Sequence, residues 1–217
     1  MIRPIILLRQ KRIVIDIDTQ RHFFMDNSKT RIFDKKTVLA NIRRVIAWTR
    51  LKNIRIISTV QIPAIDACYC NFGGDHTNGL EKIGFTLRNR RIQFDAADCT
   101  DLPINILARY DQVIFCKRCI DSFKEPRVDR MLTEFKADEF ILIGSLVEGA
   151  IKATALGLLA RRKSVRVLVD AAGSVDKDAA EIAFRQMLAK GAKLTYTHTL
   201  FGSSALRLVR ERSCPNF

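Results

Sequence analysis

The fold is decided by residues 138–171, which read DEFILIGSLVEGAIKATALGLLARRKSVRVLVDA. Residues 139–144 and 165–171 are short apolar runs of the length of a buried strand, and residues 148–162 have the composition of a helix. The order strand, helix, strand predicts one right-handed βαβ unit. In such a unit, the end of the first strand and the first helical turn direct unpaired backbone N–H groups at one spot. Ligands and reacting oxyanions bind there.

The same alternation of strand and helix extends along the rest of the chain, which predicts an α/β fold. We expect three layers: a mostly parallel six-stranded sheet with helices on both faces. The predicted strands are residues 13–18, 54–60, 112–117, 139–144, 165–171 and 193–199, the last at an edge. The predicted helices are residues 34–53, 124–135, 148–162 and 176–190, with weaker signals beginning at Asp101 and over residues 206–212. Residues 19–24 are expected to be a loop, and residues 85–94 fit either a helix or a strand.

Length and composition restrict the class of protein. The 217 residues suffice for one α/β domain, and no repeat or linker divides them, so we expect a single domain over residues 1–217. No apolar run approaches about 18 residues and no signal-peptide cleavage site is visible, which favours a soluble cytoplasmic protein without membrane contact. The six cysteines are then expected to be reduced. Cys116 and Cys119 form a CxxC at a strand end, which is typical of neither a redox helix nor a complete zinc site.

The charge is strongly basic, with a formal net charge of +14 and a pI near 9.9. The basic residues occur in scattered groups, at residues 9–12, 43–44, 88–91, 161–163 and 207–212. A solvated basic surface is one interpretation, because no nucleic-acid motif accompanies the charge. The alternative is that some groups converge on one face and attract nucleic acid or an anionic small ligand.

Three segments carry a resemblance to the isochorismatase-like cysteine hydrolases. The family pattern G-[VI]-x-T-x-x-C-V-x-x-T, followed by a strand ending D-A, is matched by Gly144, Ile151, Thr154, Asp170 and Ala171. IDTQRHFF, residues 17–24, resembles the motif I-D-x-Q-x-x-F, and QVIFCK, residues 112–117, resembles the family's strand that ends in lysine. The resemblance covers about two thirds of the chain. It implies the three-layer fold already expected.

The resemblance also implies site residues. Asp18 takes the place of the carboxylate that deprotonates the nucleophile, and Lys117 that of the catalytic lysine. A lysine that ends an apolar strand must reach solvent or a carboxylate, and Asp18 is the natural partner. The oxyanion or ligand site falls on Leu146, Val147 and Ala150, with the amides of Val147 and Ala150 as donors. Phe23 and Phe24 are expected near the pocket.

The decisive departure from the family pattern is at its nucleophile, because Ala150 stands where the family has cysteine. No metal or other cofactor is expected, since residues 59–71 (TVQIPAIDACYCN) lack the histidine and aspartate that bind metal in the nicotinamidase branch. Cys70 and either Gly74 or Gly79 match a further family loop in part. A histidine among glycines, such as His76, is more often solvated than functional.

Several functions stay open. The first is a non-covalent or inactive relative that binds a small carbonyl or carboxylate ligand, or acts as a structural or regulatory partner. The second is a hydrolase of vinyl ethers or amides that uses Asp18 and Lys117 without a thioester. A third moves the nucleophile to Cys119 or Cys70, or uses Glu148 as base, and a fourth is a basic nucleic-acid-binding module. A closed pocket with Asp18 and Lys117 hydrogen-bonded beside Ala150 favours the first two, whereas a pocket filled by His22, Phe23 or Phe24 favours a structural role. Homo-oligomers are expected because relatives with this architecture commonly associate.

Overall fold

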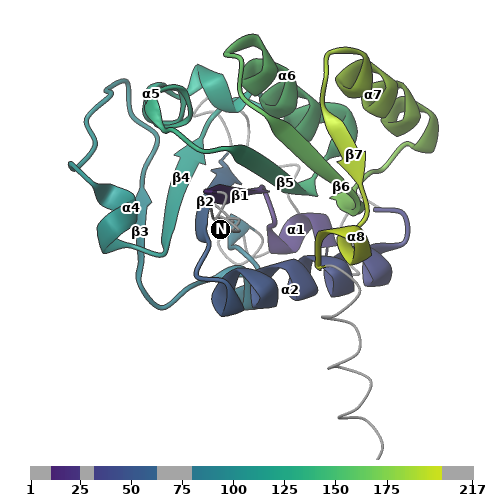
Figure 1. The fold of residues 1–217 in the computed structure, drawn as a ribbon, viewed down its shortest axis with the longest axis horizontal. Coiled ribbons are helices and arrows are strands. Elements are labelled where there is room, and N and C mark those ends of the chain that lie inside the picture. Colours follow the sequence, from purple (N-terminus) through teal and green to yellow (C-terminus); the bar gives the residue numbers. More distant parts are fainter. Residues whose placement is uncertain (1–10, 25–31, 63–79, 202–217) are drawn as a thin grey trace, which may run out of the picture.

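The structure is a computed structural model that describes residues 11–24, 32–62 and 80–201. Its centre is a seven-stranded sheet in the order β3-β4-β2-β1-β5-β6-β7, and every pair of neighbouring strands is parallel (Figure 1). The strands are β1 (Arg12–Ile17), β2 (Arg55–Gln61), β3 (Arg91–Phe94), β4 (Gln112–Lys117), β5 (Glu139–Ser145), β6 (Val165–Gly173) and β7 (Lys193–Thr195). All six predicted strands are present. The seventh is β3, in the segment that fitted either a helix or a strand.

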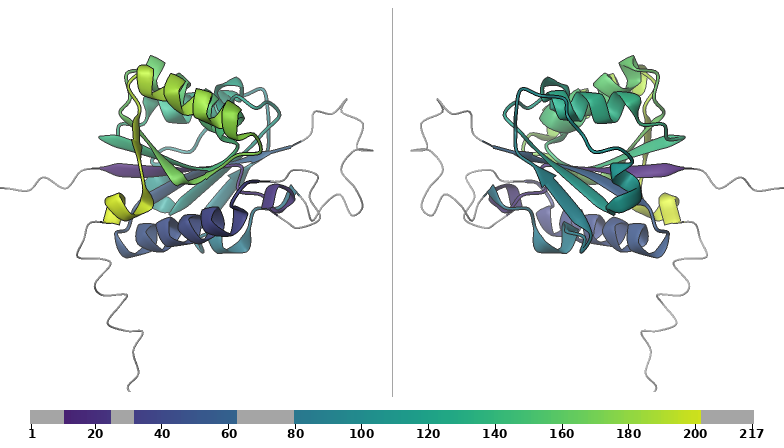
Figure 2. Two further views of the ribbon diagram at one scale, coloured as in Figure 1. Left: turned by 90° about the vertical axis from the view of Figure 1, so that its right-hand side faces the viewer. Right: turned by 90° about the vertical axis from the view of Figure 1, so that its left-hand side faces the viewer.

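Helices cover both faces of the sheet, which completes the three layers (Figures 1 and 2). One face packs against α1 (Arg21–Phe24), α2 (Lys35–Leu51) and α8 (Thr197–Phe201). The other packs against α4 (Ile106–Arg109), α5 (Pro126–Glu134), α6 (Lys152–Ala160) and α7 (Lys177–Ala189). Short turns of other helix types are η2 (Gly84–Thr86), η3 (Ser122–Lys124) and η4 (Val147–Ile151), the last a π-helix.

The central strand β1 shows why these residues form a sheet buried on both sides. Ile13, Ile15 and Ile17 enter the apolar core beneath α5, α6 and α7, whereas Val14 enters the core beneath α2. Successive side chains of a strand point to opposite faces, so a strand covered on both faces is apolar at nearly every position. One large apolar core therefore lies on each side of the sheet.

Four sequence-based expectations about the elements are wrong in their boundaries or type. Part of residues 19–24, expected to be a loop, forms the short helix α1. The helix expected over residues 148–162 begins as the π-turn η4 and continues as α6. The helix expected from Asp101 begins only at Ile106, and the last strand ends at Thr195 instead of residue 199. Residues 206–212 lie outside the described residues. No helix in the described part of the chain is long and apolar enough to cross a membrane.

Candidate functional site

The candidate site lies where the carboxyl ends of four neighbouring strands meet. The register pairs Ile17 of β1 with Gly144 of β5, and Gln61 of β2 with Lys117 of β4. Asp18 directly follows β1, so parallel pairing places it at the same edge of the sheet as Lys117 and the turn after β5. The three sequence segments that carry the resemblance therefore come together.

Asp18 and Lys117 form a buried ion pair, with Lys117 Nζ 2.7 Å from Asp18 Oδ2. The ammonium also donates to Gln61 Oε1 at 2.7 Å and to the carbonyl oxygens of Cys119 at 3.1 Å and Ile120 at 3.2 Å. The Lys117 side chain is 0% exposed, so the alternative in which it extends to solvent is wrong. More acceptors surround this ammonium than it has protons, which is the arrangement a buried charge requires.

Thr59 and Gln61 complete the site and were not predicted from the sequence. Thr59 Oγ1 donates to Asp18 Oδ1 at 2.6 Å and accepts from the Asp18 backbone N–H at 3.2 Å. Gln61 accepts from Lys117 and donates to the carbonyl oxygen of Arg118 at 3.0 Å. The available signal was weak: polar residues alternate at the end of β2, and nothing in the sequence says that they face a carboxylate.

The last residues of β5 and the turn after them have a backbone conformation that few residue types can adopt. Gly144 has a φ of +122°, and a Cβ atom there would overlap the carbonyl oxygen of Ile17 on the adjacent strand. The peptide bond from Ser145 to Leu146 is cis. Ser145 Oγ donates to the carbonyl oxygen of Asp18 at 2.9 Å, which fastens this passage to the residue that carries the carboxylate.

Ala150, which the sequence resemblance assigns to the family's nucleophile, lies in the π-turn that follows. Val147 and Ala150 are buried, at 0% and 5% exposure, and Leu146 is half-buried. Ile120, whose carbonyl oxygen binds Lys117, lies against the same turn, because a Cβ added at Gly149 would be 3.5 Å from its methyl group. The loop after β4 therefore links the ion pair to the position of Ala150.

The two phenylalanines expected near the pocket belong to the core on the α2 side. Phe24 is buried there and Phe23 is partly buried against the same cluster, as is Leu146. The ring of His22 lies 3.9 Å from the ring of Phe23. Phe23, Phe24 and Leu146 therefore belong to the same apolar cluster on the α2 side of the sheet.

Glu148, considered above as a base, connects the π-turn η4 to the loop that follows β6. Its Oε1 accepts from the backbone N–H of Val175 at 2.9 Å. Its Oε2 is buried and has no hydrogen-bond partner among the described residues. The first oxygen thus acts as a tether between η4 and the loop before α7.

The cysteines differ in their surroundings. Cys119 is exposed and contributes its carbonyl oxygen to Lys117. Cys116 is buried; burial raises the pKa of its thiol to about 11, and the neighbouring carboxylate of Asp95 adds to this rise. A thiol that keeps its proton is a poor nucleophile and metal ligand. Cys70 and His76 lie outside the described residues, as do Gly74 and Gly79.

A second buried ion pair lies two residues earlier on β1. Lys82 Nζ is 2.8 Å from Asp16 Oδ2, and both side chains are at most 3% exposed. Gln20, a member of the I-D-x-Q pattern, donates to the carbonyl oxygens of Gln61 at 3.0 Å and Leu80 at 2.7 Å. These bonds hold the end of β2 beside residues 80–82.

The described cavities lie away from this site. The larger, of about 760 Å³, is at the opposite end of the sheet, between the amino ends of β1 and β2 and helices α4 and α5. A second, of about 480 Å³, is bounded by Thr100, Lys124 and the outer side of α5. No group of three or more metal-binding side chains gathers in the described residues. Both carboxylate oxygens of Asp18 are in contact with the site's own side chains, Oδ2 with Lys117 and Oδ1 with Thr59.

A family model described as the isochorismatase domain matches residues 12–199. The chain belongs to the isochorismatase family. No sequence among the curated proteins matches it at a significant level. The match covers β1 to α8, and therefore every element that contributes to the candidate site.

Solved structures of isochorismatase-like proteins share the fold. The MAR1 ribonuclease of Caenorhabditis elegans is 21% identical over 95% of this chain and 93% of its own, with a TM-score of 0.64. A pyrazinamidase of Pyrococcus horikoshii in complex with zinc is 20% identical over 86% and 99%, with a TM-score of 0.64. An isochorismatase-like hydrolase of Alkaliphilus metalliredigens is 18% identical over 87% and 93%, with a TM-score of 0.66. At identities of 21% or less, these similarities show only that the fold is shared.

Proposed function

We propose that this isochorismatase-family chain does not form a covalent intermediate and binds a small carbonyl or carboxylate ligand at the carboxyl end of its sheet. The observation that carries the proposal is Ala150 in the first turn after β5, the position that the sequence resemblance assigns to the family's cysteine. A methyl group can neither lose a proton nor attack a carbonyl carbon. The thioester route is therefore closed at this position.

The surroundings of Ala150 keep the features that orient a small polar ligand. The Asp18–Lys117 pair is intact, and Ser145 and Ile120 fasten it to the turn on two sides. Backbone N–H groups at the beginning of a helix are suited to a carbonyl or carboxylate oxygen. Because Asp18 neutralises the ammonium of Lys117, the attraction for a carboxylate oxygen would come from these N–H groups and the positive end of the helix dipole.

A second candidate is a hydrolase that works without a thioester. It rests on Asp18, since an aspartate carboxylate positioned by Lys117 and Thr59 can act as a general base towards water. Amides belong in its substrate screen because one structural neighbour is a pyrazinamidase, and RNA belongs there because another is a ribonuclease. Vinyl ethers and carbamates complete the set.

The test compares the wild type with Asp18→Asn and Ala150→Cys over these substrates, with ligand binding followed by thermal shift. Asp16→Asn is the matched control for Asp18→Asn, because it removes the charge of the other buried pair on the same strand. Ala150→Ser is the control for Ala150→Cys, because it adds a side chain of similar size without a thiol.

The proposal expects an inactive wild type, saturable binding of a carbonyl or carboxylate compound, and turnover only in Ala150→Cys. Turnover by the wild type that Asp18→Asn abolishes and Asp16→Asn retains would establish the second candidate instead. If neither the wild type nor Ala150→Cys turns over or binds any compound, the ligand site is refuted and a structural role remains.

A further inference from the structure

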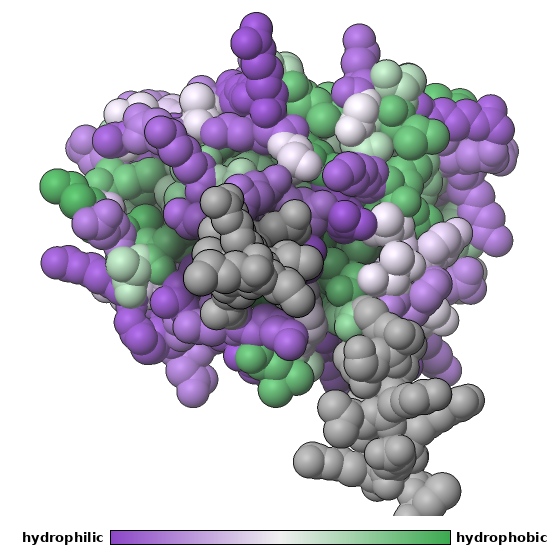
Figure 3. All heavy atoms as spheres, in the orientation of Figure 1, coloured by the Kyte–Doolittle hydropathy of each residue, from purple (hydrophilic) through white to green (hydrophobic). Residues whose placement is uncertain are grey.

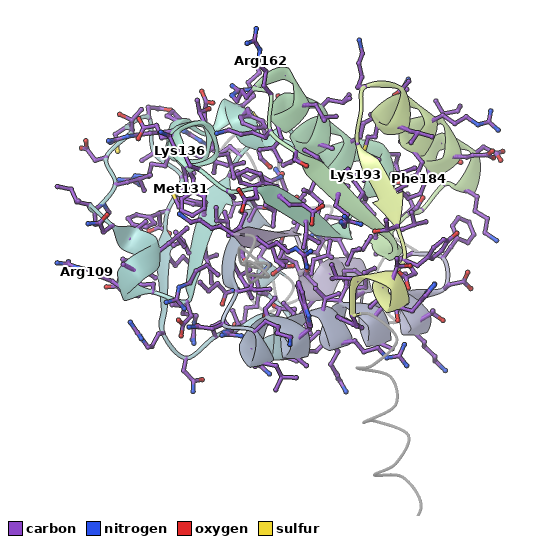
Figure 4. The ribbon with its side chains drawn as sticks, viewed as in Figure 1. Arg109, Met131, Lys136, Arg162, Phe184 and Lys193 are labelled. Atoms are coloured by element: carbon purple, nitrogen blue, oxygen red, sulfur yellow. The ribbon has the colours of Figure 1, made fainter. Side chains whose placement is uncertain are left out.

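The amino ends of the strands carry a positive charge that the candidate site does not use. We define the amino-end face as the loops that precede the seven strands, at the end of the sheet opposite Asp18 and Lys117. At least one lysine or arginine lies within the three residues before each strand: Lys11, Lys52, Arg90, Arg109, Lys136, Arg162 with Lys163, and Lys190, in the order β1 to β7. Figures 1 and 4 look onto this face.

Five of the cations on this face are exposed and have no side-chain hydrogen bond or ion pair within the described residues. They are Arg109 before β4, Lys136 before β5, Arg162 before β6, and Lys190 and Lys193 around the beginning of β7. Figure 4 labels four of them, Arg109, Lys136, Arg162 and Lys193, spread across the face. Their charges are therefore available to a partner.

The acidic residues of the same face are already engaged. Glu139 lies between Arg12 at 3.4 Å and Arg166 at 2.7 Å, and Asp111 pairs with Arg55. Asp138 accepts from the backbone N–H of Lys11 at 2.6 Å. The charges of Glu139 and Asp111 are therefore paired within the protein, whereas Asp138 is exposed and keeps its negative charge two residues from Lys136, so the five exposed cations outnumber the acidic charge left on this face.

Four of these cations lie at or just after the carboxyl end of a helix, but none of the five side chains is hydrogen-bonded to a helix carbonyl group within the described residues. Basic side chains near the last turn of a helix interact favourably with its dipole and bind its last carbonyl groups. Lys163 does this, because its Nζ donates to the carbonyl oxygens of Thr133 at 2.8 Å and Phe135 at 3.0 Å. Arg109 is the last residue of a helix of only four residues, whose dipole is small, and Lys193 is the first residue of a strand.

The amino-end face also contains the larger cavity. Its volume is about 760 Å³, and its lining combines basic side chains, Lys52 and Arg130 among them, with apolar ones such as Leu102 and Phe135. In Figure 3, hydrophilic side chains alternate with apolar ones on this face, and the apolar ones show on the side of α4 and on the side of α6 and α7. A cavity of this composition can accept the flat, partly apolar ring of a base beside a phosphate.

We propose that the amino-end face binds the sugar–phosphate backbone of a nucleic acid. The exposed cations extend from β4 to β7, five strand spacings or about 24 Å. A nucleic-acid strand in a duplex carries one phosphate per about 3.4 Å of axis, so this width matches about seven consecutive phosphates. A regular row of negative charges is the partner that complements a row of separate, uncompensated cations.

The experiment uses the full chain and measures binding to a single-stranded RNA, a single-stranded DNA and a duplex of equal length, over a range of salt concentrations. The test variant is the triple change Arg109→Gln, Lys136→Gln and Arg162→Gln. The matched control changes Lys36→Gln, Lys124→Gln and Lys177→Gln, which removes the same charge from exposed lysines in elements that begin after the carboxyl ends of strands. Circular dichroism and thermal unfolding verify that both variants fold.

The wild type is expected to bind at low salt, and the test variant to lose about tenfold or more in affinity. The slope of log K against log salt should fall by about two for a single strand and by nearly three for a duplex. The control variant should stay within about threefold of the wild type. Absence of nucleic-acid binding, equal loss in both variants, or binding only to anionic lipid vesicles would each refute the proposal. Since the variants do not touch Asp18, Lys117 or Ala150, this outcome is separate from that of the ligand screen.

Discussion

Lys82 Nζ lies 3.3 Å from the carbonyl oxygen of Thr59, the residue whose hydroxyl group binds Asp18. This contact links the two buried ion pairs, Asp16 with Lys82 and Asp18 with Lys117, through one residue of β2. Ser58, the neighbour of Thr59, also donates to Asp16 Oδ2 at 3.0 Å. The carboxylate of the candidate site is thus held by a connected polar network that extends into the sheet.

Breaking the Asp16–Lys82 pair should destabilise the fold strongly. Lys82→Met leaves a buried carboxylate without its counter-charge, and we expect a loss of about 3–5 kcal/mol in the free energy of unfolding, measured by denaturant titration. The double variant Asp16→Asn with Lys82→Met should recover much of this loss. Arg118→Gln, which removes the more exposed Arg118–Asp98 pair, is the control and should cost less than about 1 kcal/mol. Equal effects of Lys82→Met and Arg118→Gln would contradict the network.

Gly144→Ala should disrupt the turn that carries Ala150. The new Cβ atom would overlap the backbone of Ile17, and an alanine at a φ of +122° is strained in any case. We expect a loss of at least about 3 kcal/mol, or failure to fold. Gly84→Ala has open space around its Cβ position and should change stability by less than about 1 kcal/mol. Thermal unfolding of both variants tests this difference.

Cys116 should make the fold less stable in alkaline solution. Burial raises the pKa of its thiol from the ordinary 9.0 to about 11. Below pH 9 both the folded and the unfolded thiol keep their protons, so the full stability is present. Above it the unfolded thiol ionises first, and the free energy of unfolding falls, by at most about 2 kcal/mol by pH 11.

The measurement is the difference in unfolding free energy between the wild type and Cys116→Ala, from pH 8 to pH 11. Cys119→Ala is the control, because that residue is exposed and its variant should follow the wild type at every pH. Alkylation at pH 8 should modify Cys119 much faster than Cys116. A wild type and a Cys116→Ala variant with parallel pH curves would show that burial does not shift this thiol.

Asp170 should anchor α8 to the sheet. Its Oδ1 accepts from the backbone N–H and the hydroxyl group of Thr197, both at 2.8 Å, and its Oδ2 accepts from Asn41 at 3.1 Å. Asp170→Ala leaves these donors without partners, and we expect a loss of about 2–3 kcal/mol with faster amide exchange in α8. Asp176→Ala removes only the N-cap of α7 and should cost about 1 kcal/mol. Unchanged exchange in α8 would show that other contacts hold it.

The strands could be predicted because most of them are buried on both faces. β4 is buried at every position, and its central residues form a continuous apolar run of the length of a strand. β3 has only four residues, alternates between exposed and half-buried positions, and lies at the edge of the sheet. A short edge strand produces no apolar run, which is why residues 85–94 fitted two structures.

The ends of elements depend on contacts that a local pattern does not display. The chain after Thr195 leaves the sheet and forms α8 because Asp170, 27 residues earlier, binds Thr197. The π-turn over Val147–Ile151 is likewise invisible in the sequence, since its apolar periodicity resembles that of an ordinary helix.

At the site, the ends of β1 and β4 were enough to place Asp18 and Lys117 together. Thr59 and Gln61 could not be found, because the sequence does not show which polar side chains of β2 face the carboxylate. The functional roles of Asp18, Lys117 and Ala150 stay predictions that the substrate screen tests.

Because all strands of the sheet are parallel, their amino ends lie at one end of the molecule and their carboxyl ends at the other. β1 and β2 have six and seven residues, so these ends lie about 20 Å apart. That distance exceeds the Debye length of about 8 Å in physiological salt, and exposed charges at one end are screened from the other. On the two proposals made above, a polyanion and a small molecule would occupy the same protein at once without competing. The chain would then behave as an adaptor whose two occupancies vary independently.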